Sequence, residues 1–220
     1  MNPLEVLPIS IKRAIENIDY YIVENEKTAR KSIKKISSNK SQPSLHLEVL
    51  NKYTEPQALP GYLEPCFQGY DVGILSEAGC PGIADPGADV VKIAHEKGIQ
   101  VVPLVGPSSI FLALMASGMN GQSFAFKGYL PIDSADRKKA IKQMEKISTD
   151  QQQSQICIET PYRNDKLLAE MLKTLSNQTL LCIACDITLP TEYIFTKTVA
   201  DWKKTPVDLH KRPAIFIIQG

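Results

Sequence analysis

The sequence has no hydrophobic run long enough to cross a membrane. A spanning helix needs about 20 consecutive apolar residues, and polar or charged side chains interrupt every apolar run here well before that length. The N-terminus, Met-Asn-Pro-Leu-Glu, also lacks the basic and apolar segments of a secretory signal peptide. We therefore expect a cytoplasmic protein without a membrane partner.

Cysteines are few, and their number and spacing argue against a disulfide framework. There are five of them, an odd number scattered along the chain. Cys182 and Cys185 form the one close pair, but they lie in the apolar run 180–185, which predicts a buried strand. Residues three apart in a strand point to opposite faces. Because no second pair of cysteines or histidines accompanies them, we expect neither a metal nor a redox motif there.

The common nucleotide motifs are also missing. The chain has no Gly-Lys-Ser/Thr for a P-loop, and its first glycine-rich turn offers Gly79-x-x-Gly82 in place of G-x-G-x-x-G. What it has is the stretch Ser76-Glu-Ala-Gly-Cys-Pro-Gly-Ile-Ala-Asp-Pro-Gly87, followed by Val105-Gly-Pro-Ser-Ser109. Each lies between a strand-like and a helix-like run, where ligands bind in open parallel sheets. Small residues and a helix start at Ser108 predict a small polar ligand held by backbone groups.

Positive charge is concentrated in clusters although the formal net charge is only +1. Six basic residues and no acidic residue lie between positions 27 and 40, and most fall at helical spacing. Further clusters lie at 137–142 and 203–212. Each cluster is either a solvated helix face or a surface that meets phosphates. Three clusters together favour a polyanionic partner.

The order of elements predicts an α/β protein with two domains. Strands and helices alternate in residues 1–122, which indicates a parallel sheet; in residues 123–220 strands follow one another with less helix between them, which indicates a mixed sheet. Asp85 and Pro86 suit the N-cap and first position of a helix that Gly98 ends. We expect strands at 19–23, 45–49, 71–76, 100–105, 123–129, 156–159, 180–185, 193–199 and 214–218, and a loop at 148–154.

Residues 76–87 resemble the signature S-D-A-G-T-P-x-I-S-D-P-G of the ribosomal RNA small-subunit methyltransferase I group, within the tetrapyrrole methylase superfamily. Residues 101–109, 127–131 and 158–163 resemble its later motifs, and Asn2, Arg13, Ala14, Glu24 and Arg30 match its opening positions. The resemblance implies two α/β domains with S-adenosylmethionine in the cleft between them, and a homodimer. This chain departs from the pattern at Cys80 and Tyr162. The family begins with an apolar strand before the position of Asn2, so either that strand is missing here or the start codon lies upstream of Met1.

The resemblance also implies the roles of individual residues. The residues implied to contact the cofactor are Ala78, Gly79, Cys80, Ile83, Ser108, Ser109, Glu159, Thr160, Asp186, Ile187, Pro213 and Ala214. Glu159, Glu77 and Asp85 are candidates for a base that takes the proton of the acceptor. For RNA binding, the charge clusters and the motif at 158–163 indicate Arg30, Lys31, Lys34, Arg137, Lys138 and Arg163. Asp85 could serve as a helix cap instead, and Arg163 could form a salt bridge.

Three functions remain open from the sequence. The first is methylation of a ribose 2′-hydroxyl in small-subunit ribosomal RNA, which the motifs and the basic clusters favour. The second is methylation of a tetrapyrrole carbon, which the superfamily also includes. The third is binding of the cofactor or of RNA without catalysis, which the missing first strand would explain.

Overall fold

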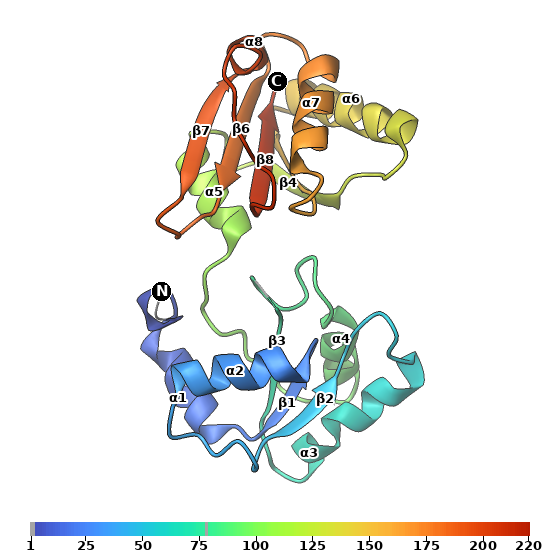
Figure 1. Ribbon diagram of the computed structural model, residues 1–220. Helices are drawn as coiled ribbons and strands as arrows, with labels where there is room; N and C mark the ends of the chain where they lie inside the picture. Colours follow the sequence, from blue (N-terminus) through green and yellow to red (C-terminus); the bar gives the residue numbers. More distant parts are fainter. Residues whose placement is uncertain (1–2, 78) are drawn as a thin grey trace. The chain divides into compact units, whose positions relative to one another are not determined.

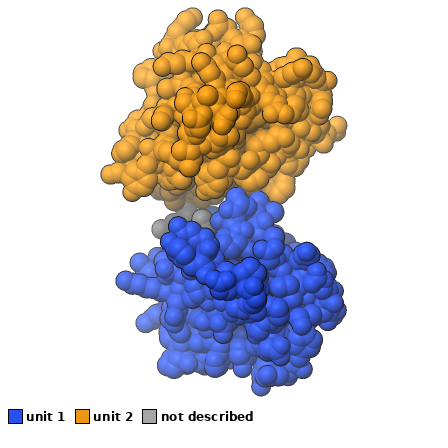
Figure 2. Space-filling model, turned by 90° about the vertical axis from the view of Figure 1, so that its right-hand side faces the viewer, with its two compact units in different colours: residues 1–108 blue, residues 109–220 orange. Residues whose placement is uncertain are grey.

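The computed structural model describes residues 3–77 and 79–220 and has the α/β architecture expected from the sequence. The chain forms two compact units, residues 1–108 and residues 109–220 (Figures 1 and 2). The boundary expected near residue 122 falls just before the first strand of the second unit. The units divide earlier because the helix α5 (Ser109–Ser117) packs on the sheet of the second unit.

The first unit is built on a three-stranded parallel sheet with the order β2-β1-β3. The strands are β1 (Tyr20–Val23), β2 (His46–Val49) and β3 (Val72–Leu75). Val23 pairs with Val49 on one side and with Leu75 on the other, so the three carboxyl ends share one edge. The segments that follow β1 and β3 therefore begin close to each other.

Helices cover both faces of this sheet, and β1 alternates between two cores. Tyr21 and Val23 pack with Ile33 of one helical layer, whereas Ile22 packs with Val90 of the other. Figure 1 shows α2 and α4 beside the sheet. The helices of the unit are η1 (Pro3–Glu5), α1 (Ile9–Asn17), α2 (Glu26–Ile36), η2 (Pro56–Leu63), α3 (Glu64–Phe67) and α4 (Ala88–Glu96).

The strand expected at residues 100–105 does not form. Within the described chain, the main chain of residues 100–105 forms no hydrogen bond, and Val102, Leu104 and Val105 are each more than half exposed. Pro103 has no N–H to donate, which disfavours pairing. Among the described strands β3 therefore pairs with β1 alone and is an edge strand.

The second unit has a five-stranded mixed sheet with the order β4-β5-β8-β6-β7. Its strands are β4 (Phe124–Tyr129), β5 (Ser154–Ile158), β6 (Leu180–Cys185), β7 (Tyr193–Thr198) and β8 (Ala214–Gln219). β4 is parallel to β5, and the other pairs are antiparallel. This is the mixed sheet expected from the sequence.

The sheet of the second unit separates two cores. Helix α5 packs on one face together with Cys182 and Ile217, and Met144 and Met171 pack on the other face together with Cys185. The cysteines of the close pair thus point to opposite faces, as the strand period predicted. The remaining helices are α6 (Ser134–Gln151), α7 (Asn164–Thr174) and α8 (Val199–Trp202).

The polar tract expected to be a loop at 148–154 is mostly helix. Helix α6 continues to Gln151 and ends where Gln152 adopts a left-handed backbone with φ of 52°. The buried Ser148 hydroxyl accepts from the Gly220 N–H at 2.9 Å, so this polar side chain is satisfied inside the unit. A search of the described residues reveals no helix that is both long and apolar enough to span a bilayer.

Candidate ligand-binding site

The carboxyl edge of the first sheet joins the segments that follow β1 and β3. The main-chain N–H of Glu77 donates to Glu24 Oε1 at 2.9 Å, and the Thr28 hydroxyl donates to the Glu77 carboxylate. Asn25 caps α2 by accepting from the Thr28 N–H at 3.1 Å. These contacts fix the point from which the glycine-rich turn leaves the sheet.

The turn after Glu77 has an unusual number of residues with left-handed backbone. Gly79, Gly82 and Gly87 have φ of 80°, 77° and 135°, and Ala84, which has a Cβ, has φ of 63°. The Gly82 N–H donates to the Pro86 carbonyl at 3.3 Å and closes the turn. A left-handed backbone at a non-glycine residue costs free energy, and such residues are often found at ligand-binding sites. Ala78, one of the expected cofactor contacts, lies outside the described residues.

The same geometry corrects the expected start of the following helix. Helix α4 begins at Ala88 with Gly87 as its N-cap residue, so Asp85 is not the cap. A Cβ on Gly87 would lie 3.4 Å from the Gly82 nitrogen, in addition to the strain at its φ of 135°. Closing the turn through Gly82 and Pro86 thus moves the cap two residues along the chain.

Among the described residues, Asp85 is instead a carboxylate without a hydrogen-bond donor, in an acidic setting. No donor contacts its side chain in the described part of the chain. Partial burial raises its pKa, and the charges of Glu24 and Glu77 raise it further. A carboxylate with a raised pKa holds a proton more readily, which suits a general base.

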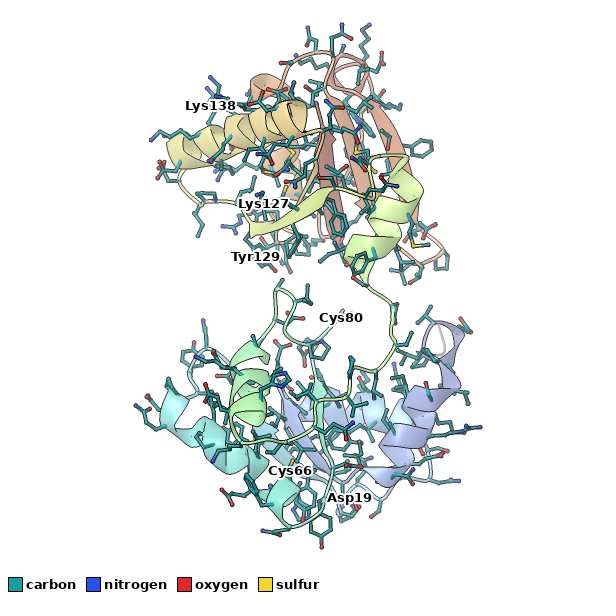
Figure 3. The ribbon with its side chains drawn as sticks, turned by 180° about the vertical axis from the view of Figure 1, so that it is seen from behind. Asp19, Cys66, Cys80, Lys127, Tyr129 and Lys138 are labelled. Atoms are coloured by element: carbon teal, nitrogen blue, oxygen red, sulfur yellow. The ribbon has the colours of Figure 1, made fainter. Side chains whose placement is uncertain are left out.

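The two segments expected to contact the cofactor within the first unit lie together. Cys80 Sγ is 3.8 Å from the Pro107 carbonyl oxygen, a weak thiol hydrogen bond. Ile83 is half exposed and Ser108 is partly buried. Figure 3 labels Cys80 on this loop. Ser109 is the exposed first residue of α5 and belongs to the second unit.

In the second unit, the other expected residues share one edge of the mixed sheet. Cys185 at the end of β6 pairs with Ala214 at the start of β8, and Ile158 at the end of β5 pairs with Ile215. The Asp186 N–H donates to the Pro213 carbonyl at 3.0 Å. This edge therefore brings Glu159, Thr160, Asp186, Ile187, Pro213 and Ala214 into one row of strand ends.

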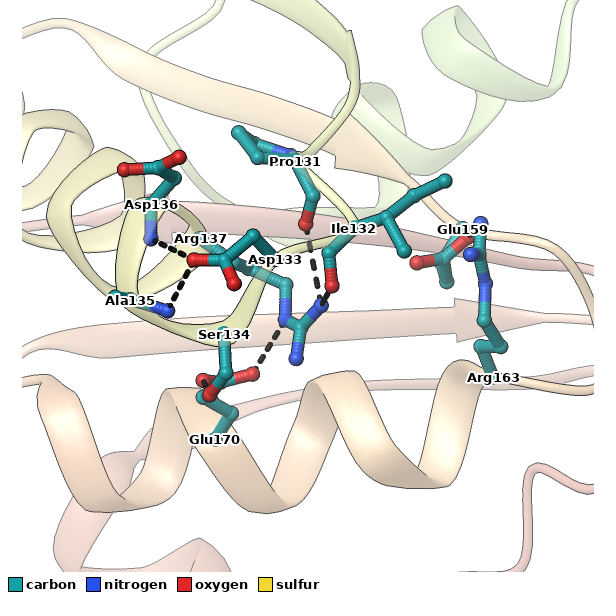
Figure 4. A network of polar contacts seen from close by, with 10 residues as sticks. All are labelled: Pro131, Ile132, Asp133, Ser134, Ala135, Asp136, Arg137, Glu159, Arg163 and Glu170. Atoms are coloured by element: carbon teal, nitrogen blue, oxygen red, sulfur yellow. Dashed lines mark hydrogen bonds and ion pairs between the residues drawn. The ribbon is translucent and has the colours of Figure 1, made fainter.

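The buried Glu159 carboxylate is committed to its neighbours. Its Oε1 accepts from Arg163 Nη2 at 2.7 Å and from the Thr160 N–H at 2.7 Å, and its side chain is 2% exposed. Figure 4 shows Glu159 and Arg163 side by side. Arg163 thus forms the salt bridge that was the alternative to phosphate binding. The same bond makes Glu159 less available as a base than Asp85.

Asp186 has a similar structural role. Its Oδ2 accepts from Arg212 Nε at 2.8 Å and from the Thr191 hydroxyl at 2.9 Å. The hydrogen bond to Asp186 raises the pKa of Arg212. Asp186 itself has a left-handed φ of 52°. Its carboxylate holds the strand ends together, and its main chain is bonded as well, since the N–H donates to Pro213 and the carbonyl accepts from the Leu189 N–H at 2.9 Å.

The residues expected to bind RNA are placed very differently from one another. Lys31 and Lys34 are exposed on α2, and Lys138 is exposed on α6, where Figure 3 labels it. Arg30 is partly buried and bonds to Glu26 and to the Gln42 carbonyl.

Arg137 is buried, which argues against the expected contact with RNA. It donates to the Glu170 carboxylate and to the carbonyl oxygens of Pro131 and Ile132 at 3.1 Å and 2.7 Å (Figure 4). On a helix that packs against a sheet, one position in each turn or so faces inward, and Arg137 occupies such a position while Lys138 does not.

Sequence reasoning gave Glu24 and Thr28 no role at the site, although they hold Glu77. Glu24 directly follows an apolar strand, and Asn25 with Thr28 forms an N-cap pattern, so the signal was a strand end next to a cap. The contact with Glu77 crosses 53 residues of sequence and is set by strand pairing.

Comparison with known proteins supports the resemblance. The profile of the Tetrapyrrole (Corrin/Porphyrin) Methylases matches residues 7–202. A Vibrio cholerae protein named ribosomal RNA small subunit methyltransferase I is 30% identical over 175 residues, which are 78% of this chain and 59% of that protein. A protein of the same name from Halalkalibacterium halodurans is 29% identical over 80% of this chain and 57% of its own. The chain thus matches somewhat more than half the length of these relatives.

Solved structures show the same fold. The crystal structure of the methyltransferase CobJ superposes with a TM-score of 0.64 at 14% identity, covering 98% of this chain and 89% of that one. The cobalt precorrin-4 methyltransferase CbiF superposes with a TM-score of 0.60 at 13% identity over the same shares. Together with the matched profile, the two sheets and the glycine-rich turn place this chain in the tetrapyrrole (corrin/porphyrin) methylase family.

Proposed function

We propose that the protein is an S-adenosylmethionine-dependent methyltransferase that methylates a ribose 2′-oxygen of small-subunit ribosomal RNA in the cytoplasm, as a homodimer. Its membership of a methylase family supports the reaction. The names of its relatives at about 30% identity support the substrate. The observation that carries the proposal is the strained, glycine-rich turn beside three carboxylates at the edge of a parallel sheet.

The residues of the turn fit this cofactor. A Cβ on Gly79 would meet no atom of the described residues beyond its chain neighbours within 4 Å, so the space beside this backbone is open to a ligand. Gly79, Cys80 and Ile83 would hold the cofactor together with Ser108, mainly through backbone groups. The acidic side chains nearby suit a ligand that carries positive charge on sulfur and on nitrogen. When bound, S-adenosylmethionine supplies a methyl group already activated by its sulfonium.

The chain's own residues would then position the acceptor and remove its proton. Asp85 is the base in this proposal, because its pKa is raised and its carboxylate has no donor in the described chain. Glu159 would serve as a fixed anion that orients Arg163 and Thr160. The exposed lysines of α2 would meet the phosphates of the RNA.

Transfer of labelled methyl groups tests the proposal. The protein is incubated with labelled S-adenosylmethionine and either small ribosomal subunits from cells lacking this modification or a precorrin. We expect label in the RNA, at a ribose, and none in the precorrin. Label in the precorrin instead would favour methylation of a tetrapyrrole carbon, and cofactor binding without any transfer would favour a non-catalytic protein.

Matched variants connect the reaction to the turn. Asp85→Asn should lower the transfer rate by about a hundredfold or more while cofactor binding persists, since positioned acid–base groups contribute about 10²–10⁴-fold. Asp89→Asn, on the exposed first turn of α4, is the control and should leave the rate within twofold. Equal rates for the two variants would refute the role of Asp85 as the base.

A further inference from the structure

An exposed tyrosine at the edge of the second sheet has a cation and a second ring beside it. Tyr162 is 71% exposed, although a tyrosine ring is a large apolar surface. Its ring meets the His210 ring edge-on, with centroids 6.2 Å apart at 80°, and Lys211 Nζ lies 5.9 Å from its centroid. We define these three residues as the Tyr162 platform.

Two loops are bonded to each other beneath the Tyr162 platform. The Lys211 N–H donates to the Pro161 carbonyl at 3.0 Å, and Asn164 Nδ2 donates to the Arg212 carbonyl at 2.6 Å. The Leu209 N–H donates to Asp165 Oδ1 at 3.0 Å. Lys211 also has a left-handed φ of 59°. The ring is therefore presented from a braced surface, which reduces the entropy lost when a ligand stacks on it.

The positive charge of Lys211 in the Tyr162 platform is available to a ligand. The side chains of Lys211 and His210 make ring contacts but no hydrogen bond or ion pair within the described chain. The neighbouring acid, Asp208, accepts from the main-chain N–H of His210 at 2.9 Å. Arg163 is neutralised by Glu159. Among the described residues, Lys211 is thus the cation of this loop pair that has no carboxylate partner and can bind an anion.

We infer that the Tyr162 platform binds an unpaired nucleotide of RNA, with the base stacked on Tyr162 and the phosphate near Lys211. An exposed aromatic ring next to an unpaired cation is the arrangement that recognises single-stranded nucleic acid. The inference rests on the proposed function, since it assigns part of the RNA contact of that enzyme. It joins Lys211, which lies in the basic cluster at 203–212, to Tyr162, which no basic cluster of the sequence indicated.

A tryptophan reporter tests the stacking directly. The single native tryptophan, Trp202, is 2% exposed, so Tyr162→Trp adds one exposed fluorophore. Titration with a 12-nucleotide single-stranded RNA should quench this added fluorescence, and the same RNA in a duplex should quench it far less. Equal quenching by duplex and single strand, or none by either, would overturn the inference.

Affinity measurements provide the second test. By fluorescence anisotropy, Tyr162→Ala should bind the single strand about tenfold more weakly and Tyr162→Phe within twofold, since stacking of one base contributes about 1–3 kcal/mol. Tyr53→Ala is the control, because Tyr53 is 78% exposed with Lys52 Nζ 4.8 Å from its ring centroid but, among the described residues, has no second ring beside it. An equal loss in the control, or binding to phosphatidylserine vesicles in place of RNA, would contradict the platform.

The outcomes separate this inference from the proposed function. RNA binding in these assays needs neither cofactor nor catalysis. If the wild type methylates ribosomal subunits while Tyr162→Ala binds RNA normally, the platform is wrong and the function stands. If Tyr162→Ala loses RNA affinity while the wild type transfers no methyl group, the platform stands and the function is wrong.

Discussion

Glu24 accepts a hydrogen bond from the main-chain N–H of Glu77 at 2.9 Å, and this bond ties the end of β1 to the end of β3. The two residues are separated by 53 positions in the sequence. The bond stands at the root of the glycine-rich turn, so the conformation of the turn depends on a side chain outside it. Glu24 is therefore a positioning residue of the proposed cofactor site.

Removing the Glu24 carboxylate should loosen the turn. We expect Glu24→Ala to lower affinity for S-adenosylmethionine about tenfold in calorimetry, since hydrogen bonds to charged groups contribute about 1.5–3 kcal/mol. Glu24→Gln keeps a carbonyl acceptor and should retain most of the affinity. Glu26→Ala removes an exposed carboxylate on α2 and is the control. Similar affinities for Glu24→Ala and Glu26→Ala would contradict the positioning role.

Asp85 should make the protein less stable as its carboxyl group ionises. Burial and the charges of Glu24 and Glu77 raise its pKa in the folded state. The folded state thus binds this proton more tightly than the unfolded state, and the free energy of unfolding falls as pH rises through the unfolded and then the folded pKa. Asp85→Asn should therefore be more stable than wild type at pH 7.

Urea unfolding at pH 7 and pH 4 measures this difference. The gain of Asp85→Asn over wild type should be smaller at pH 4, because the raised pKa keeps more of the wild-type carboxyl protonated in the fold at pH 4 than at pH 7. Asp89→Asn removes a charge that the N-terminus of α4 favours and should be slightly destabilising. A loss of stability in Asp85→Asn at pH 7 would show that burial and the neighbouring carboxylates do not disfavour the ionised form of Asp85.

Arg137 should prove structural and not RNA-binding. Its guanidinium is 4% exposed and paired with Glu170, and removing one member of a buried ion pair costs about 3–5 kcal/mol. We expect Arg137→Ala to lower the free energy of unfolding by about that amount. Lys138→Ala, one residue along on the exposed face, should change it by less than about 0.5 kcal/mol. Equal stability of the two variants would place Arg137 at the surface.

The stability that the Arg137–Glu170 ion pair contributes should depend on pH through the Glu170 carboxyl. Burial alone would raise the pKa of Glu170, but the hydrogen bonds from Ser134 and Arg137 outweigh it and lower that pKa. The stabilisation is complete above the unfolded pKa of the carboxyl and is lost as pH falls through its folded pKa. Urea unfolding of Glu170→Gln should therefore show a weaker loss of stability with acid than wild type; an identical loss would argue against the pair.

The exposed lysines of α2 should act as a phosphate-binding face. Lys31 and Lys34 lie on the solvent side of the helix, whereas Ile33 on its inner side is fully buried. Lys31→Gln combined with Lys34→Gln should weaken binding to single-stranded RNA and lower the slope of log K against log salt by about 1.4. Lys92→Gln on α4 is the control. A slope unchanged in the double variant would make this face a solvated surface.

Pattern and turn chemistry were sufficient to predict most of the elements. The period of two in residues 180–185 predicted a strand with Cys182 and Cys185 on opposite faces, and the two cores contain one each. Gly98 has φ of 68° just beyond α4, as its place after a periodic run predicted. Such signals are local, and they predict the structure correctly where core packing is compatible with the local preference.

The errors arose where tertiary context decided. Residues 100–105 have strand composition but gain no strand partner among the described residues, so composition alone could not make a strand. Arg137 resembles its basic neighbours in sequence, and only helix packing against the sheet shows that it faces inward. The bond from Glu77 to Glu24 depends on the pairing of β1 with β3, which the sequence did not specify residue by residue.

The two cores on either side of β6 have a consequence for the chemistry of the thiols. Cys157 and Cys185 lie in one core and Cys182 in the other, and burial raises the pKa of each of these thiols. The thiolate is the nucleophile that attacks an alkylating reagent, so these buried cysteines stay unreactive while their core is closed. The alkylation rates of these cysteines therefore report the opening of each core separately. Local unfolding on the two faces of the second sheet can thus be measured independently.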